Sequence, residues 1–101
     1  MSDNIPPSVG DFIKTVQTNP RVEEIILFGS RAVGDHRERS DVDLAIRGPR
    51  LLSEDWTVFK AQAEEAKTLY WISIIDFDHS PPEIQTRIRS QGKTIYGSKA
   101  S

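Results

Sequence analysis

The chain has 101 residues, of which 37% are hydrophobic and 28% are charged, and its formal net charge at pH 7 is −2. This length fits one small domain, the absence of cysteine excludes disulfides, zinc–thiolate sites and thiol nucleophiles, and no apolar run approaches the ~20 residues that span a bilayer. Because the start lacks the features of a signal peptide and no long block of basic residues occurs, we expect a cytoplasmic protein with no membrane partner and no broad nucleic-acid surface.

The first predicted elements are a short amphipathic helix and a buried strand. Residues 1–7 carry two prolines and few apolar groups, which predicts a mobile lead-in followed by a single domain over residues 8–101. Apolar residues at helical spacing predict a helix over residues 9–18, with Ser8 as its N-cap. The β-rich apolar run over residues 22–28 predicts a strand that is buried on both faces.

The middle of the chain combines a polar segment, a second strand and the longest helix. Residues 31–40 are strongly polar, which predicts a short helical turn followed by an exposed loop. Alternating acidic and apolar residues predict a strand over residues 41–46. Apolar residues that step by three and four predict a helix over residues 53–69. Its stripe places three aromatic residues in the core, namely Trp56, Phe59 and Tyr70.

The last part of the chain predicts one more strand and one more helix. β-Branched and aromatic residues predict a strand over residues 71–77. Two consecutive prolines then open a helix that Gly92 ends as residue C′, and Ile95 and Tyr96 are expected to anchor the C-terminus. The resulting order of helix, strand, strand, helix, strand and helix predicts an α+β fold, with helices packed on a small mixed sheet.

Two aspartates at the start of the second strand are the first candidates for chemistry. Asp41 and Asp43 are two residues apart, so their carboxylates project from the same face of a strand. Two like charges at this distance repel each other, and a cation relieves the repulsion. Mg²⁺ accepts carboxylate oxygens, keeps several waters and bridges to nucleotide phosphates. The pair therefore predicts a magnesium site.

A glycine and a serine at the end of the first strand are the second candidates. Gly29 permits a tight turn and a close backbone approach, and the Ser30 hydroxyl can face a phosphate. By itself, a Gly-Ser pair is usually a turn and an Asp-x-Asp pair is usually a solvated strand end. Their joint occurrence at two adjacent strand ends favours phosphoryl or nucleotidyl transfer.

The remaining polar residues carry weaker predictions. Arg31, Arg37 and Arg39 are candidates for contacting ATP phosphates or an acidic partner, although a charged loop is more often only solvated. His36 and His79 are isolated in the sequence, which is typical of surface residues. Ser30 has no histidine and aspartate arranged with it as a triad, which argues against a serine hydrolase.

The whole unit resembles the motif of a known enzyme family. Gly29 and Ser30, ten intervening residues, and then Asp41-x-Asp43 are similar to the minimal nucleotidyltransferases (MNT) of the polymerase-β-like superfamily. Residues 74–97 also resemble their last strand and helix, so the resemblance extends over residues 9–97. It implies a nucleotidyltransferase fold, ATP or another NTP as substrate, and Mg²⁺ as cofactor, with two ions when nucleotide is bound.

The resemblance also implies roles for individual residues. Gly29, Ser30 and Arg31 would bind the nucleotide, and Asp41 and Asp43 would hold the metal. Ser30 and the two aspartates would be the catalytic residues. Among MNT proteins, one of this size resembles the antitoxin of HEPN/MNT toxin–antitoxin pairs, which transfers AMP from ATP to a tyrosine of its HEPN ribonuclease partner.

One position departs from the family pattern. The family usually supplies a third carboxylate from the next strand, in the pattern Asp-x-x-Asp, whereas this chain has Ser73 at the first of those positions and Asp76 at the second. Residues three apart on a regular strand point to opposite faces, so Asp76 replaces the missing ligand only if the strand is bulged or ends early. Ser73 and Asp76 are the two candidates for a third ligand.

This departure leaves two functions open. The first is an MNT-type enzyme that moves AMP from Mg²⁺–ATP to a tyrosine hydroxyl of a HEPN-domain protein. The second is a catalytically weak MNT-fold module that neutralises a HEPN ribonuclease by direct association.

Overall fold

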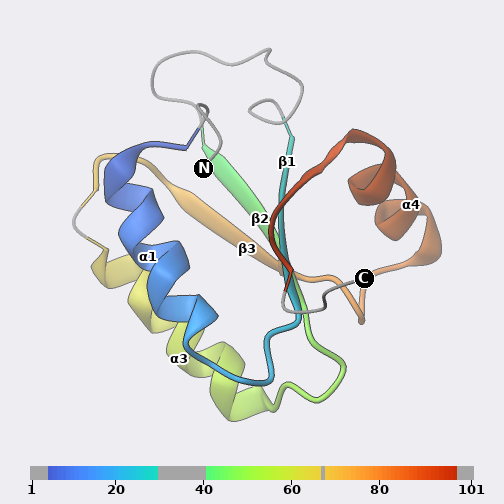
Figure 1. Cartoon of the computed structure of the whole chain (residues 1–101), viewed down its shortest axis with the longest axis horizontal. Coiled ribbons are helices and arrows are strands. Elements are labelled where there is room, and N and C mark those ends of the chain that lie inside the picture. Colours follow the sequence, from blue (N-terminus) through green and yellow to red (C-terminus); the bar gives the residue numbers. More distant parts are fainter. Residues whose placement is uncertain (1–4, 30–40, 67, 98–101) are drawn as a thin grey trace.

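The computed structural model describes residues 5–29, 41–66 and 68–97. Within these ranges the chain forms three helices and four strands (Figure 1). In chain order they are α1 (Pro7–Gln17), β1 (Glu24–Phe28), β2 (Val42–Arg47), α3 (Ser53–Glu65), β3 (Ile72–Asp76), α4 (Pro82–Gln91) and β4 (Lys93–Gly97). In these described ranges, no helix is long and apolar enough to cross a membrane.

The four strands form one mixed sheet in the order β3-β2-β1-β4. β1 runs antiparallel to β2 and to β4, whereas β2 and β3 are parallel. The predicted α+β fold with helices on a small mixed sheet is therefore confirmed. The sequence analysis expected Ile95 and Tyr96 only as an apolar anchor, but both lie in β4 and pack against the core.

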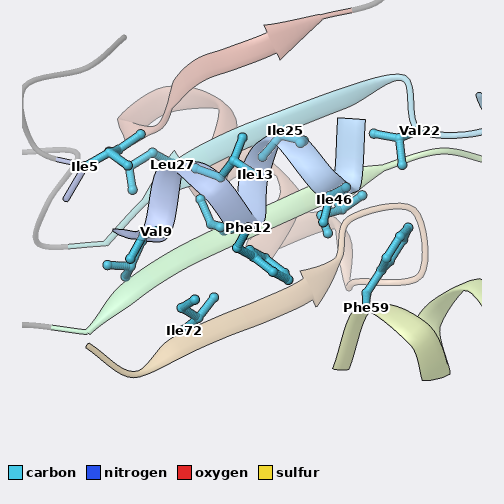
Figure 2. Packing of buried hydrophobic residues seen from close by; sticks show 13 residues of the cluster. Ile5, Val9, Phe12, Ile13, Val22, Ile25, Leu27, Ile46, Phe59 and Ile72 are labelled. Atoms are coloured by element: carbon cyan, nitrogen blue, oxygen red, sulfur yellow. The ribbon is translucent and has the colours of Figure 1, made fainter. Parts of the chain in front are cut away.

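The sheet is covered on both faces, with α1 and α3 on one side and α4 on the other (Figure 1). Because successive residues of a strand point to opposite faces, Ile25 and Leu27 join the main core, while Ile26 joins a smaller core with Ile88 of α4. Figure 2 shows part of the main core, with Phe12 of α1 among the side chains of the sheet. β1 is therefore buried on both faces, as the sequence predicts.

The N-terminal boundary differs from the prediction. Ile5 is buried in the main core, and Pro7 is the first residue of α1, so residues 5–7 belong to the folded domain rather than to a lead-in. Pro6 occupies the N-cap position expected for Ser8. The Ser8 hydroxyl instead donates a hydrogen bond to Thr68 Oγ1 at 2.9 Å, which ties α1 to the chain before β3.

Two helix ends also differ from the prediction. α3 ends at Glu65, four residues earlier than expected, because Ala66 already has extended backbone. Gly92 ends α4 as expected, but it does so as the C-cap with a φ of −80° rather than as a left-handed C′ residue. A Cβ at Gly92 would overlap the Ile88 carbonyl oxygen, so close packing explains this glycine.

The three aromatic residues predicted to share one helical stripe all pack at the core, but only Trp56 and Phe59 lie on α3, because the helix ends before Tyr70. Phe59 is buried, and Trp56 and Tyr70 pack against the main core while partly exposed. The rings of Trp56 and Phe59 meet edge to face, with 5.6 Å between their centroids and 83° between their planes. Their prediction as core residues is confirmed.

A network of charges fixes one end of the sheet. Glu24, the first residue of β1, accepts hydrogen bonds from Arg47 Nε at 2.7 Å, from Arg89 Nη1 at 2.7 Å and from the Thr94 hydroxyl at 3.1 Å. Hydrogen bonding from Arg89, followed by that from Arg47, lowers the pKa of Glu24 to about 2, although burial opposes the shift. A single buried carboxylate thus joins β1, β2, α4 and β4 at the sheet end that lies away from Gly29.

Candidate active site

The other end of the sheet begins with the turn after β1. Gly29 has a φ of +76°, in the left-handed region that side chains disfavour. A Cβ at this position would overlap Oδ2 of Asp43. Both observations require glycine here, and they place the backbone of the predicted phosphate-binding turn directly against one of the predicted metal ligands.

The strand register places Asp43 between two neighbouring strands. Asp43 pairs with Phe28 of β1 on one side and with Ser73 of β3 on the other. Asp41 immediately precedes β2 and is exposed, two residues from Asp43. The structure therefore brings Gly29, Asp41, Asp43 and Ser73 to the same end of three adjacent strands.

Burial and a neighbouring carboxylate both disfavour the charged form of Asp43. Burial raises the pKa of Asp43, and repulsion by Asp41 raises it further. In the part of the chain that the structure describes, no basic side chain forms an ion pair with either aspartate. A bound cation would lower the electrostatic energy of this arrangement.

The donor set fits a hard divalent cation that retains water. Asp41 and Asp43 offer carboxylate oxygens, and Ser73 offers a neutral hydroxyl on the adjacent strand. Mg²⁺ is commonly held by one or two protein carboxylates, with waters and phosphates completing its six ligands. The described ranges contain no group of three or more His, Cys, Asp or Glu side chains that could hold a metal, so two carboxylates are what this part of the chain supplies.

The two candidates for a third ligand lie in different places. Ser73 is directly beside Asp43, whereas Asp76 is three residues further along β3 and pairs with Ile46. Asp76 Oδ2 lies 2.7 Å from His79 Nδ1, and the Asp76 carbonyl oxygen accepts the Ser80 hydroxyl hydrogen bond at 2.8 Å. The parallel register is regular through this stretch, so Asp76 is not in position to share a cation with Asp43.

Comparison with known protein families agrees with this geometry. The family model described as polymerase beta, nucleotidyltransferase matches residues 11–101. The chain belongs to this nucleotidyltransferase family. A comparison with curated proteins finds no match.

Several solved structures of toxin–antitoxin complexes share the fold of this nucleotidyltransferase chain. A toxin–antitoxin structure with AMP-PNP is 19% identical, with a TM-score of 0.68, covering 97% of this chain and 76% of that chain. A mutant MntA–HpeT complex is 22% identical, with a TM-score of 0.67 and coverages of 89% and 73%. The tri-AMPylated HEPN toxin of Shewanella oneidensis in complex with its MNT antitoxin is 21% identical, with a TM-score of 0.65 and coverages of 91% and 71%.

Some predicted site residues of this nucleotidyltransferase lie outside the described residues, namely Ser30, Arg31, His36, Arg37 and Arg39. His79 is exposed and contacts Asp76, which confirms its prediction as a surface residue.

The sequence analysis gave Trp71 only a place in the third strand, and the structure places its backbone beside the start of β2. The Trp71 carbonyl oxygen accepts a hydrogen bond from the Val42 N–H at 2.9 Å, between the two aspartates in sequence. Trp71 is nevertheless 70% exposed. Its position two residues before Ser73 was the signal that could have drawn attention to it.

Proposed function

We propose that this chain transfers AMP from Mg²⁺–ATP to a tyrosine hydroxyl of a HEPN-domain protein and thereby acts as an antitoxin. The observation that carries the proposal is the contact geometry between Gly29 and Asp43. It brings a turn suited to phosphate and a carboxylate suited to a cation to the same point. Membership of the nucleotidyltransferase family supports the class of reaction.

The transfer is a displacement at the α-phosphorus of ATP. The acceptor oxygen forms a bond to the α-phosphorus, and the bond between the α-phosphorus and the oxygen that bridges to the β-phosphate breaks. Pyrophosphate leaves with the bonding electron pair, and the hydroxyl proton passes to solvent. Bound Mg²⁺ supplies charge neutralisation for the phosphates, and Asp41 and Asp43 are the residues that would hold it.

Gly29 and Asp43 contribute by their positions. The backbone at Gly29 approaches the phosphates without a side chain in the way, and its N–H can donate to a phosphate oxygen. Strand pairing on both sides holds the backbone of Asp43, so the point from which its carboxylate projects is fixed before nucleotide binds.

The similar structures support both the nucleotide and the partner. One of them contains AMP-PNP, an ATP analogue, and another contains a HEPN toxin that carries AMP groups. We transfer these properties to the present chain as part of the proposal.

A second function is favoured by Ser73. A hydroxyl replaces the carboxylate expected beside the metal site, which reduces the negative charge available for cation binding. A chain with this site that turns over slowly would neutralise a HEPN ribonuclease by association alone.

The test is transfer of labelled AMP from ATP to a HEPN-domain protein of the same organism, over a Mg²⁺ series. We expect label on the HEPN protein with the wild-type chain and none with Asp43→Asn. Asp76→Asn is the matched control because it removes a carboxylate at the other end of β3, and it should retain transfer. Binding of the HEPN protein without transfer of label would instead establish the association-only function.

A further inference from the structure

The helix α4 covers the face of the sheet that carries the candidate active site. Ile26 of β1 and Ala45 of β2 form the smaller core with Ile88 of α4. Asp43 lies two residues before Ala45 on the same strand, so it projects from the same face, as does its partner Ser73 on β3. A ligand bound at Asp43 therefore lies on the side of the sheet where α4 is packed.

The helix crosses this face diagonally, because it connects the two edge strands of the described sheet. β3 ends beside Ile46, at the Glu24 end of the sheet. β4 begins beside Leu27, at the Gly29 end, and Figure 1 shows it leaving α4 at the end of the sheet where β1 ends. One flank of α4 therefore faces the Glu24 end, and the other faces the end that carries Asp43.

Side-chain contacts identify the flank that faces Glu24. Arg89 Nη1 donates a hydrogen bond to Glu24 Oε2 at 2.7 Å. Gln85 Nε2, from the preceding turn of the helix, donates to the carbonyl oxygen of Phe77 at 2.8 Å, just after the end of β3. Arg89 and Gln85 thus mark one flank of α4, and residues of the opposite flank face the Asp43 end.

Arg87 lies on that opposite flank. Successive residues of an α-helix are about 100° apart around its axis, so Arg87 and Arg89 lie on the two sides of Ile88, which is buried against the sheet. Arg87 is exposed, and no acidic side chain of the described ranges forms an ion pair with it. Arg89 shows that an arginine on a flank of α4 is long enough to reach a group on this face of the sheet. Arg87 has the same reach toward the end that carries Asp43.

We propose that Arg87 binds the phosphate chain of the nucleotide at this site. The inference rests on the proposed function, and it deepens it by adding a positively charged residue that contacts the substrate from the side of α4. A guanidinium group presents its N–H donors in a planar arrangement that matches phosphate oxygens. Phosphates that lie between the Gly29 turn and the two aspartates would be within its reach.

The charges of the site give Arg87 its role. Asp41 and Asp43 are both acidic, and in the described part of the chain no basic side chain pairs with either of them. The nucleotide brings further negative charge, and negative charge moves onto pyrophosphate as it leaves. An arginine directed at the phosphates offsets part of this charge, both when the nucleotide binds and when the bond to pyrophosphate breaks.

The experiment measures binding of Mg²⁺–AMP-PNP and of Mg²⁺–tripolyphosphate by calorimetry, for the wild-type chain and Arg87→Gln. Tripolyphosphate presents a chain of three phosphates without a nucleoside, so it reports on phosphate contacts alone. We expect Arg87→Gln to bind both compounds at least tenfold more weakly. Arg50→Gln is the matched control, because Arg50 is an exposed arginine that follows β2 at the Glu24 end, and its replacement changes the net charge equally. It should leave both affinities unchanged.

Three results would overturn the role of Arg87. They are wild-type affinities in Arg87→Gln, an equal loss in Arg50→Gln, and weaker binding of AMP-PNP with unchanged binding of tripolyphosphate, which would assign Arg87 to the nucleoside. In each case AMP transfer by the wild type would leave the proposed function intact.

Two further results separate this role from the proposed function. Absence of AMP-PNP binding by the wild-type chain would reject both. Weaker binding of both compounds by Arg87→Gln, with no AMP transfer by the wild type to a HEPN-domain protein, would retain Arg87 as a phosphate-binding residue and reject the proposed transfer.

Discussion

Each end of the sheet holds a carboxylate that is largely or partly buried, and the surroundings shift the pKa values of the two in opposite directions. At one end Glu24 accepts hydrogen bonds from two arginines and a threonine, and its pKa is lowered to about 2. At the other end Asp43 faces Asp41, and burial and this repulsion raise its pKa. The fold supplies two arginines to Glu24, whereas no basic side chain of the described residues pairs with Asp43.

Both ends are built from the same pair of strands. β1 and β2 align Glu24 with Arg47 at one end and Phe28 with Asp43 at the other, about 13 Å away at the usual rise of a strand. A carboxylate that is neutralised by ion pairs, like Glu24, stabilises the fold. A carboxylate with a raised pKa, like Asp43, is typical of functional sites. The comparison separates an acid that is neutralised within the fold from a candidate functional acid in the same sheet.

The largest effect that we expect at the Asp43 end comes from Gly29→Val. A branched residue is strained at a φ of +76°, and its Cβ would overlap Asp43 Oδ2. Calorimetry with Mg²⁺–ATP should show loss of binding by a factor of 100 or more, on the order of 3 kcal/mol. By comparison, Ser30→Ala removes one hydrogen bond and should cost about 1 kcal/mol, or up to about 3 if the hydroxyl meets a charged phosphate. Nucleotide affinity in Gly29→Val equal to that of the wild type would show that this turn does not bind phosphate.

At the Glu24 end, Glu24→Gln should reduce stability and leave nucleotide binding intact. The variant leaves Arg47 and Arg89 without their shared anion, which should lower the free energy of unfolding by about 2 kcal/mol, less than for a fully buried pair because Arg89 is half exposed. Urea unfolding measures the change. Asp43→Asn is the contrasting variant and should be neutral or slightly stabilising, because it removes repulsion. Equal destabilisation by both variants would abolish the distinction between the two ends.

Lowering the pH should selectively remove the contribution of Glu24 to the stability of the fold. The folded-state pKa of Glu24 is about 2, below its ordinary value of 4.5, so its contribution is fully present above about pH 5 and is lost as the pH falls toward 2. The full shift corresponds to about 3 kcal/mol. Unfolding of the wild type and of Glu24→Gln at pH 6 and pH 3 should therefore give curves that converge in acid. A constant difference between the two proteins would contradict the assigned pKa.

The Asp43 end was more predictable from sequence than the Glu24 end. Gly29, Asp41 and Asp43 can be identified from residue type and short spacing, and the family pattern singles out Ser73, which the structure pairs with Asp43. In contrast, Arg89 and Thr94 reach Glu24 from 65 and 70 residues away, and no local pattern indicates such contacts.

The strand β4 and the exposed position of Trp71 could also be recognised only from the structure, because both depend on contacts that no local pattern indicates. β4 has only Ile95 and Tyr96 as large apolar residues, so its strand character depends on pairing with β1 rather than on its own composition. Trp71 has the residue type of a core position, and only the fold shows that it lies at the entrance of β3 with its side chain exposed.

The smallest expected effect comes from Ser73→Asp, which tests how an added negative charge beside Asp43 acts with and without a cation. Without Mg²⁺, a third anion next to Asp43 adds repulsion and should lower stability by about 1 kcal/mol. With Mg²⁺ the same anion is favourable, so Mg²⁺ should bind several-fold more tightly and AMP transfer should increase. Unfolding with and without Mg²⁺ separates these contributions, because the variant's stability deficit should shrink or reverse as Mg²⁺ is added.

Asp76→Asn is the control for this experiment, because it changes a carboxylate on the same strand that contacts His79 instead of the site. It should alter neither Mg²⁺ affinity nor transfer. Loss of transfer in Asp76→Asn, with no gain in Ser73→Asp, would reject the register argument and return Asp76 to the metal site. A gain confined to Ser73→Asp would show that position 73 sets the strength of a cation site whose other charges, unlike those around Glu24, the described fold leaves unneutralised.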